Sequence, residues 1–432
     1  MQRLKTVCLR RLGGNRATEV KFGRWLRNKK VKITELIEQS LQKTASLTEG
    51  LHVLAIQDTT ELNYQAHAQR TNGLGTVGNG TDKGLFLHPM LTLNADTGAC
   101  LGLSGLKVWA RHRVEGRTYW TLPIEEKESY RWLEVAEQAK KTLSKGAITT
   151  IIADRESDIY EEWARIPDAK THLLTRVCRD RALAGSGFLY STVDQWPVQD
   201  VYSIDVPARP KKRSAHQAKL ALRFGRVTIK RPSKCKGTNL PESIDLTVVD
   251  VRELPESVVG DEEPIHWRLF TTHQAETVEQ AKHIVGWYRL RWLIEQLFRI
   301  LKKQGLDLES SQLEHADSLM KLAVLAVQVA VTSLQLVSSR NSQTEQAVSD
   351  VFNQKEISLL RVLLGQYEGR TQSQKNPYDS KQLAWAAWII ARIGGWKGYK
   401  SESAPGPITM LRGLREFAIL YKGWTLQNEM CA

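Results

Sequence analysis

The chain has 432 residues, with 61 lysines and arginines against 47 aspartates and glutamates, and a formal net charge of +14 at pH 7. Such a length accommodates one large catalytic core with insertions, or two or three domains. The basic excess favours a polyanionic partner, nucleic acid first, over the alternative of a charged surface that serves only solubility.

The five cysteines are scattered, without a CxxC pair or a histidine at metal-ligand spacing. This pattern is typical of free thiols in a reducing compartment and not of a disulfide or zinc framework. No apolar run is expected to be long enough to span a membrane, and the basic start lacks the apolar core of a signal peptide. We therefore expect a cytoplasmic protein without a membrane partner.

The first half of the chain alternates strands with helices. A basic, mostly helical stretch fills residues 1–50. A helix follows residue 154, with Ser157 or Asp158 as its N-cap. Short apolar runs and one amphipathic run predict strands over 51–56, 85–94, 100–109, 148–153 and 172–178, and a helix over 125–143.

The second half begins with alternating, antiparallel-like strands and ends in helices. The predicted strands are 200–206, 218–229, 244–251 and 265–272, and the predicted helices are 275–304 and 313–337, with further helices after a polar break. This order favours a mixed α/β core interrupted by an antiparallel module. We expect the regions 1–50, 51–178, 179–265, 266–340 and 341–432, in which 51–178 and 266–340 form the two parts of the core.

A run without acidic residues extends from residue 207 to residue 237 and is densely basic between Lys211 and Lys236. We interpret it as a contact to the DNA backbone, with charge protection of an exposed strand edge as the alternative. If roughly six to ten phosphates are neutralised in all, affinity should fall roughly 10³–10⁵-fold between 50 and 200 mM salt.

Two predicted strands end in aspartate, at Asp58 and at Asp154. A carboxylate at a strand end, just outside the core, is well placed to hold a hard divalent cation. By composition alone, each aspartate is better explained as an ordinary strand-end or capping residue. Together with a third carboxylate they would suit phosphoryl transfer, in which two Mg²⁺ ions about 3.5–4 Å apart activate the attacking oxygen and stabilise the leaving one.

The third carboxylate is Glu295, in the predicted helix 275–304. Three residues lie at offsets that return to nearly the same helix face, in one line about 20 Å long: Tyr288, Arg291 and Lys302. One carboxylate framed by an aromatic ring and two cations suits a metal ion held against a phosphate backbone.

Four of these residues follow the pattern Y-x2-R-x3-E-x6-K: Tyr288, Arg291, Glu295 and Lys302. Asp58 begins the segment D-T-T, and Asp154 begins D-R-E-x-D. With these motifs the chain resembles bacterial insertion-sequence transposases of the DDE type, in the YREK subgroup of the insertion-sequence-four family. The resemblance runs from about Leu12 to the C-terminus.

The resemblance implies a ribonuclease-H-like fold, with an antiparallel β insertion before the last catalytic helix and helical N- and C-terminal regions. It implies cut-and-paste transposition through a hairpin at the transposon end, in a synaptic homodimer that acts in trans. The partners would be the terminal inverted repeats and target DNA, both double-stranded. Asp58, Asp154 and Glu295 would be the ligands of two Mg²⁺ ions, for which Mn²⁺ would substitute.

The resemblance also implies a set of DNA-binding residues: Arg176, Trp267, Tyr288, Arg291, Trp292 and Lys302. Tyr288, Arg291 and Lys302 would hold phosphates near the transposon terminus. Trp267 and Trp292 would accommodate a flipped base, since stacking on an indole recovers roughly 1–3 kcal/mol. Core packing is the alternative for both tryptophans.

Family members usually begin with a longer helical segment that reads the inverted repeat, so residues 1–50 resemble a shortened form of that DNA-binding region. Residues 341–432 resemble the dimerisation region, with a plain helical subdomain as the alternative. Three functions remain in competition: a transposase, a catalytically incompetent inhibitor that dimerises with an active relative, and a nuclease without strand transfer.

Overall fold

The computed structural model describes residues 6–78, 80–111, 122–208, 214–235, 239–341, 346–399 and 401–430. It begins with three helices, α1 (Leu9–Gly13), α2 (Arg16–Arg27) and α3 (Ile33–Leu47). Helix α2 starts where the Asn15 side chain accepts a hydrogen bond from the Thr18 amide, a standard N-cap. The helical character expected for residues 1–50 is therefore confirmed from residue 6 onward.

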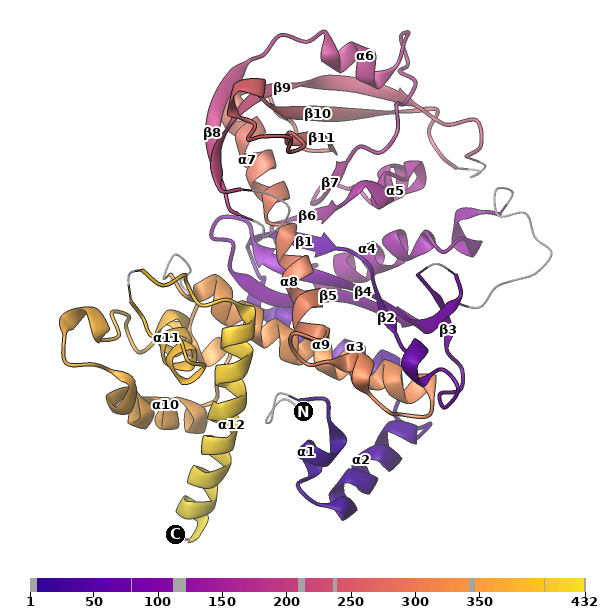
Figure 1. Cartoon of the computed structure of the whole chain (residues 1–432). Coiled ribbons are helices and arrows are strands. Elements are labelled where there is room, and N and C mark those ends of the chain that lie inside the picture. The colour runs from indigo at the N-terminus through magenta and orange to yellow at the C-terminus, as the bar shows by residue number, and fades with distance from the viewer. Residues whose placement is uncertain are drawn as a thin grey trace.

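The strands of the described residues form one mixed sheet (Figure 1). They are β1 (His52–Gln57), β2 (Thr60–Asn63), β3 (Gly75–Val77), β4 (Asp82–Asn94), β5 (Cys100–Trp109), β6 (Ile148–Ala153), β7 (Thr171–Arg176), β8 (Asp200–Val206), β9 (His216–Lys230), β10 (Ser243–Glu253) and β11 (His266–Thr271). The order is β2-β4-β1-β6-β7-β11-β10-β9-β8, and β3 and β5 also pair with β4. Strands β1, β6 and β7 are parallel, whereas β4 and β5 are antiparallel to their neighbours. This is the expected ribonuclease-H-like core.

Both faces of the central strands are buried, and the alternation of side chains assigns each residue to a face. On β1, Leu54 and Ile56 belong to the apolar cluster under α3, α7, α8 and α9, whereas Val53 and Ala55 belong to the cluster under α4, α5 and α6. We call these the front face and the back face, respectively. The helices are α4 (Tyr130–Thr142), α5 (Tyr160–Arg165), α6 (Leu189–Asp194), α7 (Val278–Arg289), α8 (Trp292–Leu301) and α9 (Ala316–Ser339).

The antiparallel strands expected between residues 179 and 265 extend the core sheet and do not form a second one. Strand β11 pairs with β7 of the core, and β10, β9 and β8 follow outward in that order. The front-face cluster continues along them through Leu222, Val249 and Leu269. The insertion therefore enlarges the front face beside the core.

Two helix predictions need correction. The helix expected over 125–143 begins only at Tyr130, after a short 3₁₀ turn at Ile124–Glu126. Helix α5 starts after Ile159 without a side-chain cap, so the expected cap at Ser157 or Asp158 is wrong. Both side chains are buried and bound elsewhere, the Ser157 hydroxyl to Glu162 and the Asp158 carboxylate to Arg181.

Helix α9 corrects the expectation that no apolar run could span a membrane. It is 24 residues long, and an 18-residue window has a mean hydropathy of 1.8, which is sufficient for a membrane span by length and composition. In the folded chain, 78% of that window is buried against the rest of the protein. The high hydropathy is thus explained by the position of α9 at the centre of the front-face core.

The C-terminal region is a helical layer built on the end of α9. It contains α10 (Gln354–Tyr367), α11 (Leu383–Ile393) and α12 (Pro407–Met430). Trp385 and Trp388 on α11 are buried in its apolar core. Figure 1 shows that α12 projects away from the body of the molecule, with the C-terminus at its tip. The helices expected for this region are therefore present.

Candidate active site

Asp58 and Asp154 lie at matched positions at the carboxyl ends of two adjacent parallel strands. Strands β1 and β6 pair with a constant register, in which Ile56 lies opposite Ile152. Two further residues along each strand bring Asp58 opposite Asp154. Neighbouring strands are about 4.8 Å apart, so the two carboxylates start from adjacent backbone positions.

Both aspartates project from the front face. Asp58 follows Ile56 by two residues, Asp154 follows Ile152 by two, and the two isoleucines belong to the front-face core. Arg176 ends β7 at the next equivalent position, because the β6–β7 register places Ala153 opposite Thr175. Three charged residues that are distant in sequence therefore form a row across the strand ends.

Arg291 connects this row to Glu295. Its Nη1 donates to Asp58 Oδ2 at 3.2 Å, and its Nη2 donates to Glu295 Oε1 at 2.6 Å. The side chains of Arg291 and Asp58 are each 19% exposed, and that of Glu295 is 33% exposed. One guanidinium thus holds the strand-end carboxylate against the helix carboxylate.

The electrostatics of the row favour a bound cation. Burial, and then repulsion from Asp154, raises the pKa of Asp58 to about 7, although Arg291 opposes the shift. Further positive charge beside Asp58 would lower this pKa and keep its carboxylate ionised. The hard oxygen atoms of carboxylates are the ligands that Mg²⁺ prefers. Among the described residues, no three His, Cys, Asp or Glu side chains lie close enough together to hold a metal ion as they stand.

The helix that carries Glu295 is interrupted, which corrects the continuous helix expected over 275–304. Helix α7 starts at Val278, after an N-terminal capping box formed by Thr277 and Gln280, and ends at Arg289. Helix α8 runs only from Trp292 to Leu301.

The break is a tighter turn at Leu290 and Arg291. Four turn bonds there connect an amide to the carbonyl three residues earlier, at Leu290, Arg291, Leu293 and Ile294. Winding with three residues per turn rotates α8 relative to α7. Lys302 lies beyond α8 in an extended conformation. The expected row of four side chains therefore does not lie on one continuous helix, and Lys302 lies outside it. Arg291 still meets Glu295 through the side-chain bond.

The remaining candidate DNA-binding residues surround this row. Tyr288 is buried, and its ring meets the edge of Trp267 at 6.0 Å. Burial raises the pKa of Tyr288, whereas the nearby Arg291 and Arg176 lower it. Trp267 is partly buried against the front-face core, and Trp292 is 40% exposed at the start of α8. Arg176 donates to the carbonyl of His266 at 3.0 Å.

A histidine cluster at the opposite end of the same front-face strands was missed by the sequence analysis. The Thr150 hydroxyl lies 2.8 Å from His52 Nε2 and 2.7 Å from His273 Nε2. His172 stacks on His273 at 4.0 Å, and the ring of Trp287 on α7 lies 5.1 Å from His273. His52 and His172 are separated from Asp58 and Arg176 by even numbers of residues, a signal of a shared face that was available in the sequence.

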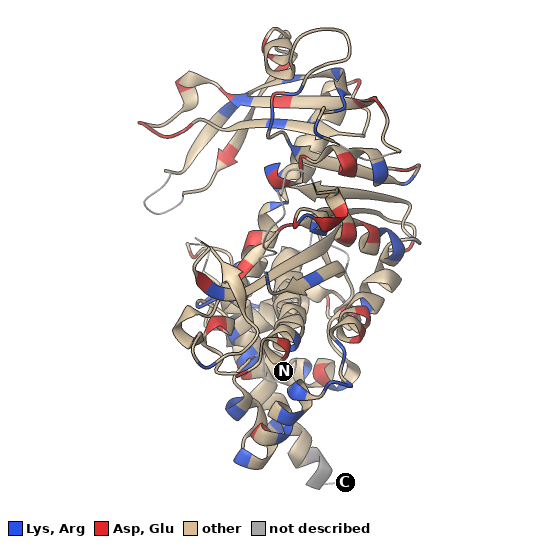
Figure 2. Cartoon of the chain, turned by 90° about the vertical axis from the view of Figure 1, so that its right-hand side faces the viewer, with Lys and Arg blue, Asp and Glu red and all other residues tan. Residues whose placement is uncertain are grey.

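The basic run between Lys211 and Lys236 is described only in part, because residues 209–213 and 236–238 lie outside the described residues. Within it, Arg226 and Lys230 are exposed on β9. Both are separated by an even number of residues from Leu222 and Phe224, which belong to the front-face core. Their side chains therefore lie on the front face as well. Lysine and arginine positions also occur along the N-terminal helices at the lower end of the molecule (Figure 2).

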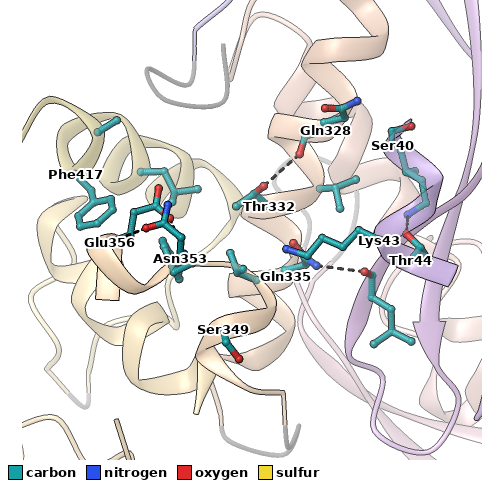
Figure 3. Close-up of a pocket in the computed structure, with 18 of the residues that line it drawn as sticks. Ser40, Lys43, Thr44, Gln328, Thr332, Gln335, Ser349, Asn353, Glu356 and Phe417 are labelled. Atoms are coloured by element: carbon teal, nitrogen blue, oxygen red, sulfur yellow. Dashed lines mark hydrogen bonds between the residues drawn. The ribbon is translucent and has the colours of Figure 1, made fainter. Parts of the chain in front are cut away.

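A cavity of about 510 Å³ lies elsewhere, between α3, β5, α9, α10 and α12 (Figure 3). Its polar lining includes Lys43, Gln335 and Glu356. None of the three site carboxylates lines it. The row of charges on the front face is therefore the candidate active site.

Comparison with known proteins supports a transposase. Residues 126–329, a little under half of the chain, match the family model described as the transposase DDE domain. The matched range includes Asp154 and Glu295, and Asp58 precedes it. The structure also aligns with a piggyBac transposase synaptic complex with hairpin DNA, at 9% identity and a TM-score of 0.31, over 68% of this chain and 54% of that chain. A likeness this weak carries no functional argument.

Proposed function

We propose that this chain is a metal-dependent DNA transposase of the YREK subgroup, with Asp58, Asp154 and Glu295 as the carboxylates of its metal site. The observation that carries the proposal is the matched register of Asp58 and Asp154, together with the Arg291 bridge from Asp58 to Glu295. The transposase DDE domain in residues 126–329 supports the class of reaction.

The three carboxylates would hold two Mg²⁺ ions, with Mn²⁺ as a substitute. Bound metal would supply charge stabilisation and an activated oxygen nucleophile for phosphodiester hydrolysis and strand transfer. The donor chemistry fits, because all three side chains offer carboxylate oxygens and the largely buried Asp58 is repelled by Asp154. The part played by the chain is to present Asp58 and Asp154 from the ends of two paired strands and Glu295 from α8.

The DNA-binding residues have separate roles in this proposal. Arg291, Tyr288 and Lys302 hold backbone phosphates beside the carboxylates, because a guanidinium suits bidentate phosphate contacts. Trp267 and Trp292 accept a base extruded during hairpin formation. Both tryptophans leave part of the ring accessible for this purpose, and Trp292 is 40% exposed.

The proposal includes a synaptic homodimer on terminal inverted repeats and target DNA, inside the cell. Helix α12 supports dimerisation, because it exposes three large apolar side chains, Ile419, Leu420 and Leu426. Single exposed apolar residues are ordinary, but three on one projecting helix favour a protein contact. The double variant Leu420→Lys and Leu426→Lys tests this part of the proposal by sedimentation. A dimeric wild type and a monomeric variant would support it.

The decisive experiment removes one carboxylate at a time. The substrate is a supercoiled plasmid that carries the gene with its flanking DNA, incubated with Mn²⁺ or Mg²⁺. Asp58→Asn, Asp154→Asn and Glu295→Gln should each abolish cleavage and keep DNA binding. Glu137→Gln, on the exposed side of α4, is the matched control and should cleave like the wild type. Full cleavage by any one of the three variants would contradict the metal site.

A second assay separates transposase from nuclease. Supplying a cleaved transposon end and a target plasmid should give a covalently joined product. Cleavage without joining would identify a nuclease with the same metal site. DNA binding without any cleavage, together with inhibition of a full-length relative, would favour the alternative of a transposition inhibitor.

A further inference from the structure

A closed ring of hydrogen bonds lies on the back face of the sheet, directly behind Asp58 and Asp154. Gln57 and Thr59 flank Asp58 on either side, and because side chains alternate along the strand they face away from it. Glu156 and Ser157 belong to the 3₁₀ turn Arg155–Ser157 that directly follows Asp154. The ring connects these two loops through side chains from three other elements: His88 on β4, Arg131 on α4 and Glu162 on α5.

One half of the ring runs from the Asp154 loop to the Asp58 loop through Arg131. Its Nη2 donates to Glu156 Oε2 at 2.8 Å, and its Nε donates to Thr59 Oγ1 at 2.9 Å. Thr59 Oγ1 in turn lies 2.7 Å from His88 Nδ1. The Arg131 side chain is 11% exposed and its bond to Thr59 is partly buried, whereas Glu156 is 61% exposed and its bond to Arg131 is open to solvent.

The other half returns from the Asp58 loop to the Asp154 loop. His88 Nε2 lies 3.1 Å from Gln57 Oε1, and Gln57 Nε2 donates to Glu162 Oε1 at 3.1 Å. The Ser157 hydroxyl donates to Glu162 Oε2 at 2.5 Å. Gln57, His88, Glu162 and Ser157 are each at most 1% exposed. The ring closes because Ser157 is covalently joined to Glu156, where the first half began.

The donors of the ring have a single consistent direction. Gln57 Nε2 donates to Glu162, so the Gln57 carbonyl accepts from His88 Nε2; Thr59 Oγ1 accepts from Arg131 and donates to the remaining ring nitrogen, His88 Nδ1. His88 is therefore unprotonated at Nδ1 and donates from Nε2 to the Gln57 carbonyl. Burial, with Arg131 and Lys107 nearby, lowers the pKa of His88 and keeps its imidazole neutral, as this direction requires.

We infer that this ring is a positioning device that sets the relative placement of the Asp58 and Asp154 loops and thereby the affinity of the metal site. The inference rests on the proposed function. Backbone pairing of β1 and β6 ends at Ile56 and Ile152, one residue before Gln57 and two before the aspartates. Beyond that point the ring supplies the side-chain connections between the loops, without touching the reacting atoms.

The test opens the ring without changing any proposed metal ligand. Gln57→Met keeps the shape of the side chain and removes both of its hydrogen bonds. Glu162→Gln is the conservative variant, since its amide still accepts from Gln57 and still pairs with Ser157. Thr92→Val is the matched control, because Thr92 is buried on the same strand and face as His88 and its hydroxyl has no hydrogen-bond partner among the described residues.

The primary measurement is Mn²⁺ binding by calorimetry, without DNA, on the full chain. Loss of partners behind metal ligands typically weakens metal affinity about 10–100-fold. Gln57→Met should fall in that range, whereas Glu162→Gln and Thr92→Val should bind like the wild type. Selective ¹⁵N-histidine labelling should show His88 protonated at Nε2 in the wild type.

Unchanged Mn²⁺ affinity in folded Gln57→Met would overturn the inference, even if the thermal midpoint falls, because the ring would then serve stability alone. Protonation of His88 at Nδ1 would overturn it as well. If Gln57→Met does not fold, Ser157→Ala opens the ring at its bond to Glu162. The Mn²⁺ affinity of that variant is then measured and interpreted in the same way. A wild type that binds Mn²⁺ but cleaves no DNA would reject the proposed function and leave this inference standing.

Discussion

Acid should destabilise the protein through the histidine cluster beneath Trp287, and His273→Gln should remove much of that sensitivity. Burial, followed by repulsion from His172 and His52, lowers the pKa of His273 to about 3. The cluster is therefore built from neutral imidazoles. Glutamine retains a hydrogen-bonding group for the Thr150 hydroxyl but does not take up a proton.

The direction and size of the effect follow from linkage. An unfolded histidine has a pKa near 6.5, so between pH 6.5 and about 3 the unfolded chain binds the proton and the folded chain does not. The stability that His273 contributes is therefore complete above pH 6.5 and is lost as the pH falls towards 3. At about 1.4 kcal/mol per pH unit, the loss at pH 4 is up to about 3 kcal/mol.

The assay is urea unfolding followed by tryptophan fluorescence at pH 7, 6, 5 and 4. Many carboxylates titrate in this range, but they are common to both proteins and cancel in the difference between wild type and variant. That difference should shrink by roughly 2–3 kcal/mol from pH 7 to pH 4. His283→Gln, on the exposed side of the same α7, is the control and should follow the wild type at every pH.

Parallel stability curves for wild type and His273→Gln would refute the reasoning, because His273 would then take up its proton equally in both states. A difference that grows towards low pH would have the wrong sign and would mean that the folded state favours the imidazolium.

Three further predictions concern other charged groups. Asp158→Asn should lower the free energy of unfolding by about 3–5 kcal/mol in urea titrations, because it leaves the 5%-exposed Arg181 without its counter-charge; a loss below 1 kcal/mol would contradict this. Arg291→Lys should weaken both cleavage and affinity for transposon-end DNA, measured by gel shift, since one ammonium does not reproduce its two-sided bonding; equal activity would rule out that role. The double variant Arg226→Gln and Lys230→Gln should reduce the slope of log affinity against log salt by about 1.8, and an unchanged slope would exclude both from the DNA interface.

The sequence alone predicted most strands and the positions of the carboxylates, because both depend on short-range pattern. Apolar runs that end in Asp58 and Asp154 predicted strand ends, and the structure has β1 and β6 end one residue before each. The spacing from Tyr288 to Glu295 identified the helical segment that faces them. The six-residue separation of His52 and Asp58 also indicated that both side chains lie on one face of the strand. The sequence analysis did not use that signal.

Tertiary structure decided which of these residues meet and how the chain bends to allow it. The register of β1 against β6 brings Asp58 beside Asp154, and it depends on pairing between residues about one hundred positions apart. The tighter turn occurs at Arg291, whose side chain bonds to the carboxylates of Asp58 and Glu295. Helical periodicity in the sequence does not predict this turn, because Asp58 is distant in the chain. Helix α9 has the composition of a membrane span, and only its packing makes it a core helix. Local periodicity reports the face a side chain takes on its own element, whereas the partner it meets depends on long-range packing.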